Sequence, residues 1–129
     1  MSNLKTQNQN SNLKSNIRYR AYQFSLSIIK LIQSFPEKKT FWVFADQLLR
    51  SATSIGANLI EAKSSSSKRD FIKYYEISLK SANETVYWLC LLRDSNLIEK
   101  EKVQPFIDEV KQIANMIASS LLTMKNKKI

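Results

Sequence analysis

Histidine is absent from the 129-residue chain, and cysteine occurs once, as Cys90. The lack of histidine excludes Ser-His and Cys-His nucleophile pairs, histidine general bases, histidine-based metal sites and helical ribonucleases that need a histidine beside an arginine. A single cysteine forms no internal disulfide, and inside an apolar helical run we expect a buried, unreactive thiol. We therefore expect no enzymatic activity, no metal and no cofactor. A nuclease based on lysine and glutamate is the remaining enzymatic alternative.

Turn-forming residues are also scarce, with one glycine and two prolines. A sheet protein needs more of them, so the composition favours long helices joined by few loops. Hydrophobic residues make up 43% of the chain, which is enough to fold one domain around one core. The chain lacks a basic-then-apolar N-terminal segment and any apolar run long enough to span a bilayer, so we expect a cytoplasmic protein.

Acidic residues are outnumbered, with 20 Lys and Arg against 11 Asp and Glu, a net charge of +9. A basic protein attracts polyanions. Five of the 20 basic residues lie in the two ends of the chain, which leaves 15 basic against 11 acidic residues in the body and weakens the case for a dedicated nucleic-acid groove. These five are Lys5, Lys14, Lys125, Lys127 and Lys128.

The chain divides into a polar tail at 1–16, a helical domain at 17–124 and a basic C-terminal tail at 125–129. The first tail consists mainly of Asn, Gln, Ser and Lys and is expected to be disordered. Helices are predicted over 17–34, 40–62, 68–94 and 100–124. With short connections, they indicate an all-α, antiparallel up-down-up-down four-helix bundle.

Local signals set the boundaries of these helices. Pro36 ends the first helix. Ser67, with Asp70 three residues later, has the form of a capping box that starts the third helix. Ser95-Asn96 ends the third helix, and Pro105 falls near the first turn of the fourth, where a missing N–H costs little.

Each predicted helix carries core-facing residues at steps of three and four, the spacing of one helix face. These residues are Ile17, Ala21, Phe24, Ile28, Leu31 and Phe35 in the first helix; Phe41, Phe44, Leu48, Ala52, Ile55, Leu59 and Ala62 in the second; Phe71, Tyr75, Ser78, Ala82, Val86, Leu89 and Leu92 or Arg93 in the third; and Val103, Phe106, Val110, Ile113, Ile117, Leu121 and Met124 in the fourth.

The second helix has two further lines besides its core stripe. One consists of apolar or small residues. The other is polar and runs between the core stripe and this apolar or small line. A flank exposed to water normally carries Lys and Glu pairs, so we predict that a second subunit covers this helix, with Gly56 and Ala57 allowing a close approach. The apolar or small line, Trp42, Leu49, Thr53, Gly56 and Ile60, is the candidate oligomer interface; the polar line is Gln47, Ser51, Ser54, Asn58 and Glu61.

Buried polar groups need partners, and Arg50, Glu61 and Glu84 are the candidates to form a charge-paired network with Asn58. The alternative is that the polar line is simply hydrated and that Gly56 is a tolerated flaw costing about 1 kcal/mol.

The motif Q-x-x-R-S-A-x-S-I-x-x-N-x-x-E at 47–61, with S-x-x-D-F at 67–71, S-A-N-E at 81–84 and Phe35-Pro36, resembles the four-helix-bundle family also called the ribosomal-RNA intervening-sequence proteins. The resemblance covers residues 17–124. Two features depart from the family pattern: Ala62 replaces the usual glycine, and the loop at 63–67 is rich in serine rather than basic residues.

The resemblance implies a small cytosolic bacterial protein that forms a ring-like homopentamer. Members are often encoded within insertions of the large ribosomal RNA gene. The accessory protein of diversity-generating retroelements is similar in fold and is associated with reverse transcriptase and nucleic acid. The resemblance implies no enzymatic activity.

Candidate contacts with nucleic acid lie on the third helix. Its outward line is Arg69, Lys73, Glu76, Lys80, Asn83 and Tyr87, where the cations would follow phosphates and Tyr87 would stack on a base. The alternative is a solvated basic face.

The serine loop is a second candidate. Lys63, Lys68 and Arg69 flank it and would hold a phosphate with the N–H groups that begin the third helix, unless the loop is an ordinary cap. Four other aromatic residues, Tyr19, Tyr22, Tyr74 and Trp88, fit core or interface fillers better than base platforms.

These features predict a non-catalytic oligomeric protein that binds RNA or DNA as an accessory or scaffold factor, beside a reverse transcriptase or ribosomal RNA. The alternative is a protein-protein adaptor without a nucleic-acid role, whose charge serves solubility.

Overall fold

The computed structural model describes residues 16–126, which form four helices and contain no strand. The helices are α3 (Ile17–Gln33), α4 (Lys39–Ser64), α5 (Lys68–Asp94) and α6 (Lys100–Asn126). The all-α class expected from the sequence is confirmed. The disorder expected for the N-terminal tail, and the charges of Lys5, Lys14, Lys127 and Lys128, concern residues outside the described range.

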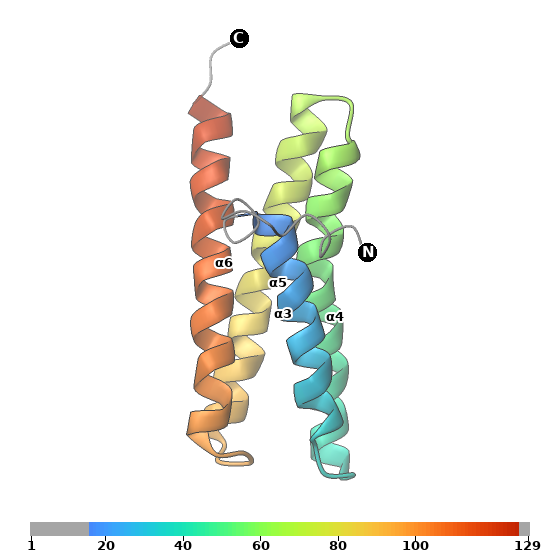
Figure 1. Cartoon of the computed structure of the whole chain (residues 1–129), viewed down its shortest axis with the longest axis vertical. Helices are drawn as coiled ribbons and strands as arrows, with labels where there is room; N and C mark the ends of the chain where they lie inside the picture. The colour runs from blue at the N-terminus through green and yellow to red at the C-terminus, as the bar shows by residue number, and fades with distance from the viewer. Residues whose placement is uncertain (1–15, 127–129) are drawn as a thin grey trace, which may run out of the picture.

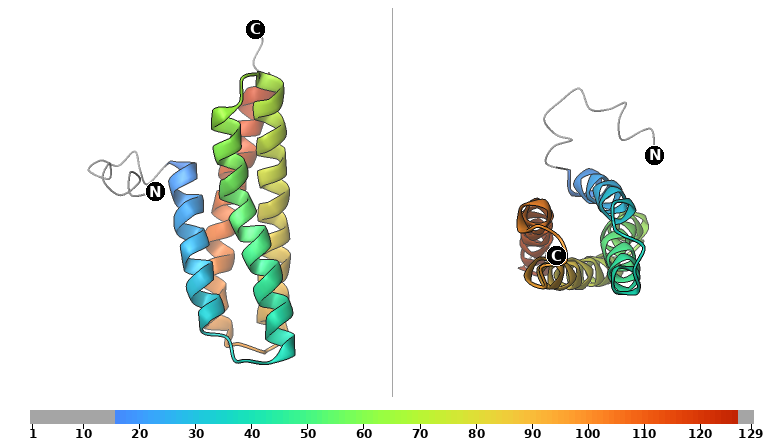
Figure 2. Two further views of the ribbon diagram at one scale, coloured as in Figure 1. Left: turned by 90° about the vertical axis from the view of Figure 1, so that its right-hand side faces the viewer. Right: turned by 90° about the horizontal axis from the view of Figure 1, so that it is seen from below.

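In Figure 1, α3 and α5 run downward while α4 and α6 run upward. The view from below in Figure 2 shows α3 and α5 on opposite sides of the bundle, with α4 and α6 between them. Because α3 is the shortest helix, α4, α5 and α6 alone form the upper end of the bundle (Figure 1).

Side-chain caps mark the starts of α3 and α5, both at the positions predicted from the sequence. The Ser67 hydroxyl accepts the backbone N–H of Asp70 at 3.1 Å, so α5 begins at Lys68. Asn96 has a φ of 62° and turns the chain after α5. Asn16 caps α3 by accepting the N–H groups of Arg18 and Tyr19, so it belongs to the folded domain rather than to the tail.

The last helix differs from its prediction in two details. It continues to Asn126, so Lys125 is a helical residue and not part of a tail. Pro105 is exposed on its second turn rather than its first.

The core stripes of α3 and α4 are confirmed, with every predicted helical position buried. Phe35, just beyond α3, packs partly buried against the core. In α5, Ser81 and Thr85 are buried while Phe71 and Val86 are only partly covered, and in α6 Ile107 is buried in place of Phe106. Because 3.6 residues make one turn, steps of three and four leave such neighbouring choices open until the packing partners decide them.

Candidate nucleic-acid interface

The outward line of α5 is exposed along its whole length, from Arg69 through Lys73 and Lys80 to Tyr87. These residues recur at steps of four and seven, which keeps them on one helix face. The opposite face is held by buried residues of the same helix, Tyr75, Ser78, Ala82, Leu89 and Leu92. The packing of α5 therefore fixes the direction in which the cations project.

The single acid on this line is neutralised from another helix. Lys125 Nζ of α6 lies 2.7 Å from Glu76 Oε2, and both side chains are about half exposed. The carboxylate therefore does not cancel the charges of Lys73 and Lys80, its neighbours on the line. The sequence did not indicate this pair, because Lys125 lies 49 residues from Glu76.

Aromatic residues pack against one another at the Tyr87 end of the line. Tyr87 is 59% exposed, and its ring centroid lies 5.3 Å from that of Trp88 with the planes at 80°. Trp88 in turn meets Phe44 edge to face at 6.0 Å, and its Nε1–H donates to Glu84 at 3.4 Å. Trp88 is thus a partly buried filler, and so are Tyr19, Tyr22 and Tyr74.

The serine loop forms an ordinary cap. The Ser67 hydroxyl already occupies the Asp70 N–H, and the Ser65 hydroxyl donates to the Ala62 carbonyl at 2.6 Å. Lys63 is exposed on the other side of the loop, and Lys68 is half-buried.

Part of the polar line of α4 is covered by α5 of the same chain, whereas Glu61 at its end is exposed. Buried Ser51 is hydrogen-bonded to Thr85 at 2.9 Å, and Ser54 to Ser81 at 2.9 Å. The buried Ser78 hydroxyl donates to the Ile55 carbonyl of α4 at 2.9 Å. The predicted burial holds fully for Ser51 alone, and the expectation that a second subunit covers Ser51 and Ser54 is wrong, because α5 of the same chain does so. A matching ladder on the third segment, Ser78, Ser81 and Thr85, is the signal that would have indicated α5.

The predicted charge network forms only in part. Arg50 Nη2 lies 3.0 Å from Glu84 Oε2 and also donates to Gln47. Asn58 instead donates to Ser54, at 2.8 Å to the carbonyl and 3.0 Å to the hydroxyl. Glu61 is exposed, and its side chain has no hydrogen bond or ion pair within residues 16–126. The expected contact of Asn58 with charged groups is wrong, because its amide reaches back one turn along its own helix.

The remaining line of α4 borders α3. Trp42 is 60% exposed, Leu49 and Ile60 are exposed at 42% each, and Thr53 is also exposed. Gly56 faces α3 of its own chain, since a Cβ built there would lie 3.5 Å from the Cβ of Ala21. The close approach predicted for another subunit is therefore made within the chain.

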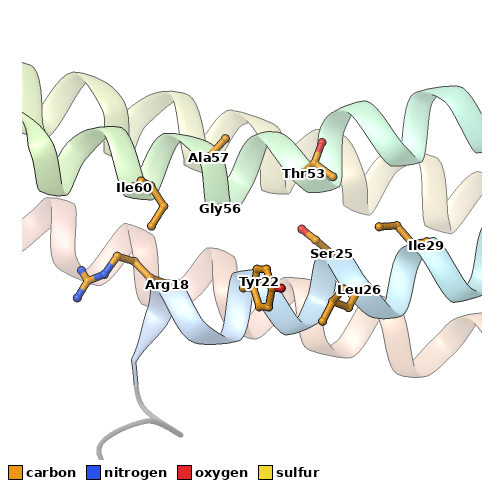
Figure 3. Close-up of a pocket in the computed structure, with 9 residues that line it drawn as sticks. All are labelled: Arg18, Tyr22, Ser25, Leu26, Ile29, Thr53, Gly56, Ala57 and Ile60. Atoms are coloured by element: carbon orange, nitrogen blue, oxygen red, sulfur yellow. The ribbon is translucent and has the colours of Figure 1, made fainter. Parts of the chain in front are cut away.

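A groove of about 290 Å³ separates the outer edges of α3 and α4 at this level (Figure 3). In Figure 3, Arg18 and Ile60 lie toward one end and Ile29 toward the other. The lining residues are Arg18, Tyr22, Ser25, Leu26, Ile29, Thr53, Gly56, Ala57 and Ile60. The groove is lined mainly by apolar side chains, and Leu49 and Trp42 on the same line of α4 are exposed, so this face differs from an ordinary hydrated helix face.

Reactive groups are sparse in the part of the chain that the structure describes. Within residues 16–126, no cluster of three His, Cys, Asp or Glu side chains is placed to hold a metal ion. Cys90 is half-buried rather than fully buried as expected. A hydrogen bond from Arg93 lowers the pKa of Asp94, an effect confined to the exposed end of α5. No helix among the described residues is long and apolar enough to cross a membrane.

The sequence pattern of the 23S rRNA-intervening sequence proteins matches residues 14–119. The chain belongs to this family. A similar solved structure is that of a protein of unknown function from the S23 ribosomal protein family of Bacteroides thetaiotaomicron. It is 34% identical, the alignment covers 81% of this chain and 94% of that one, and the TM-score is 0.76. None of the curated proteins compared with the chain matches it. The family resemblance carried by the 47–61 motif is confirmed.

Proposed function

We propose that this family member is a non-catalytic, oligomeric accessory or scaffold protein that binds RNA or DNA through the outward face of α5. The observation that carries the proposal is the exposed line of Arg69, Lys73 and Lys80, whose only acid, Glu76, is paired with Lys125. Three cations remain available to phosphates on one rigid face.

The length of the line suits a nucleic-acid backbone. At 1.5 Å per residue, the Cα atoms of Arg69 and Lys80 lie about 16 Å apart along the helix axis. Cations that neutralise phosphates release condensed counterions, and this supplies sequence-independent affinity. In a ring of copies, the α5 lines would together form a basic band.

Assembly is the second part of the proposal. The α3–α4 groove and the exposed side chains of Trp42, Leu49 and Ile60 would form the contact between copies, because exposed apolar patches commonly mark interaction sites. The number of five copies that we propose, and an association with ribosomal RNA or a reverse transcriptase, rest on the family resemblance.

A salt titration tests nucleic-acid binding. Binding of a labelled RNA or DNA is followed by fluorescence anisotropy between about 50 and 200 mM salt, where phosphate contacts give a steep loss of affinity. The Lys73→Ala, Lys80→Ala double variant should weaken binding and flatten this dependence. Lys30→Ala is the control, because it removes an exposed lysine from α3, on the opposite side of the bundle from α5. It should change the affinity and its salt dependence only by the small effect of one lost positive charge. Absence of binding at low salt, or affinity that ignores salt, contradicts the proposal.

Solution mass tests assembly, measured with and without RNA at low salt. Leu49→Glu or Ile60→Glu should lower the mass toward that of one chain, because a charge would then lie in the contact. Leu122→Glu, at a leucine 65% exposed on α6, is the matched control. If the solution mass of the wild type is that of a single chain, the proposed assembly is wrong.

A protein-protein adaptor is the second candidate function, favoured by a separate apolar hollow between α4 and α5. Exposed Val43 and Leu91 border it together with Trp88, and its volume is about 450 Å³. In a pull-down, an adaptor retains its partner after nuclease treatment, whereas a nucleic-acid scaffold releases it.

Purified protein that cleaves RNA, with the activity lost in Lys73→Ala, would contradict the absence of catalysis.

A further inference from the structure

We infer that the nucleic acid recognised by α5 is single-stranded and that an unpaired base stacks on Tyr87 at the end of the cation line. The inference rests on the proposed function and narrows it from nucleic acid in general to strands with unstacked bases.

The spacing places Tyr87 in register with the cations. It follows Lys80 by seven residues, the same interval that separates Lys73 from Lys80, so all three side chains share one face of α5. At 1.5 Å per residue, the line from Arg69 to Tyr87 extends about 27 Å. A strand whose phosphates follow the cations therefore reaches the ring without leaving this face.

The ring of Tyr87 has an aromatic neighbour on one side, the partly buried Trp88. Trp88 packs against it at 5.3 Å between centroids, and Trp88 itself is fixed by Phe44 and by the Glu84 carboxylate. More than half of Tyr87 nevertheless remains accessible. Bases stack on aromatic rings that are exposed in this way and packed against the protein on one side. Stacking tolerates any base, because every base has a flat face.

A duplex would use this surface poorly. Its bases are stacked on one another, and a protein reads only their edges in the grooves. Asn83 could read a base edge, and so could a cation of the line that leaves its phosphate, but neither contact uses the face of Tyr87. Phosphate contacts would remain, but the tyrosine ring would have no base face to meet.

The test compares a labelled 20-nucleotide oligouridine with a blunt RNA duplex that has the same number of phosphates. Wild-type protein should bind the single strand about tenfold more tightly. Tyr87→Ala should lower single-strand affinity about tenfold, the order of one base–aromatic stack, and leave duplex affinity and the salt slope unchanged. Tyr87→Phe keeps the ring and should bind like wild type. Tyr87→Leu keeps apolar bulk without a π-face and should resemble Tyr87→Ala.

The outcomes separate this inference from the proposed function. Equal affinity of the wild type for strand and duplex overturns the inference and leaves nucleic-acid binding intact. Failure to bind either RNA at low salt overturns the inference, and it overturns the proposed function as well if a DNA strand and a DNA duplex of the same lengths also fail to bind. If Tyr87→Ala and Tyr87→Leu retain single-strand affinity, or change the solution mass of the assembly, then Tyr87 is not a base platform and the inference is wrong.

Discussion

The side-chain hydroxyls of Ser51 and Thr85 are hydrogen-bonded at 2.9 Å between α4 and α5, and both residues are buried. Thr85 Oγ1 also lies 2.8 Å from the Ser81 carbonyl. Every hydroxyl in this contact therefore has a partner within the chain, so this part of the flank needs neither water nor a second subunit to satisfy its polar groups.

Removing one member of this pair should cost more than removing both. Thr85→Val preserves shape but leaves the buried Ser51 hydroxyl without its partner, so we expect the free energy of unfolding to fall by about 1–3 kcal/mol. Adding Ser51→Ala should recover part of the loss, because two apolar partners of similar shape need no hydrogen bond. Urea unfolding of the four proteins of this cycle measures the coupling, and strictly additive losses would contradict it.

Gly56→Ala should stabilise the fold. The new methyl group would lie 3.5 Å from the Cβ of Ala21, an ordinary contact, and alanine is about 1 kcal/mol better than glycine inside a helix. We expect the free energy of unfolding, measured by urea denaturation of the single chain, to rise by about 0.5–1 kcal/mol. A loss of stability would mean that α3 and α4 pack more tightly than this distance indicates.

Substitution of Arg20 should lower the free energy of unfolding, because its side chain connects α3 to α6. Its guanidinium meets both Glu109 oxygens, at 3.1 and 2.7 Å, and donates to Gln112 at 2.8 Å. Lysine keeps the charge but cannot reproduce this fork, so Arg20→Lys should cost about 1 kcal/mol. Lys102→Ala, which breaks the exposed pair with Glu99, should have no measurable effect on urea unfolding. Equal effects of the two substitutions would rule out a special role for the fork.

Glu76→Gln should strengthen nucleic-acid binding. The substitution removes the one acid on the α5 line and frees Lys125 to meet a phosphate. We expect a two- to fivefold gain in affinity at low salt, on the order of one added phosphate contact, and a steeper salt dependence. Glu101→Gln on the first turn of α6 is the charge-matched control. An unchanged salt slope would argue against strand contact near Lys125.

Alkaline pH should weaken the fold through Tyr75. Burial raises the pKa of its hydroxyl above the ordinary 10.0, and the charge of Arg18 partly offsets this. The folded state holds this proton more tightly, so the contribution is fully present below the unfolded pKa and is lost as pH rises through the folded pKa. Between about pH 9 and 11, the thermal midpoint of the wild type should therefore fall more steeply than that of Tyr75→Phe. Tyr87→Phe, which removes a phenol from the surface, is the control, and parallel profiles for wild type and Tyr75→Phe would contradict the assignment.

Local chemistry was sufficient for the helices and for much of the core. The start of α5 follows from Ser67 accepting the Asp70 N–H three residues away, and the turn after it follows from Asn96. The stripes of α3 and α4 could be predicted because apolar periodicity depends only on neighbours in the sequence. On α5, three hydroxyl residues blurred the periodicity, and Ser81 and Thr85 were missed as core positions.

The sequence by itself determined four amphipathic helices, the outward cation line of α5 and the need for something to cover the polar flank of α4. Only the tertiary structure decided what covers it: Ser51 and Thr85 are 34 residues apart, and the hydroxyl ladder of α5 does not by itself tell whether the covering helix belongs to the same chain or to a second copy. The same holds for Lys125, which resembles a tail charge until folding brings it 2.7 Å from Glu76. Periodicity is a property of one segment, whereas the pairing of polar groups depends on which segments the packed core places side by side.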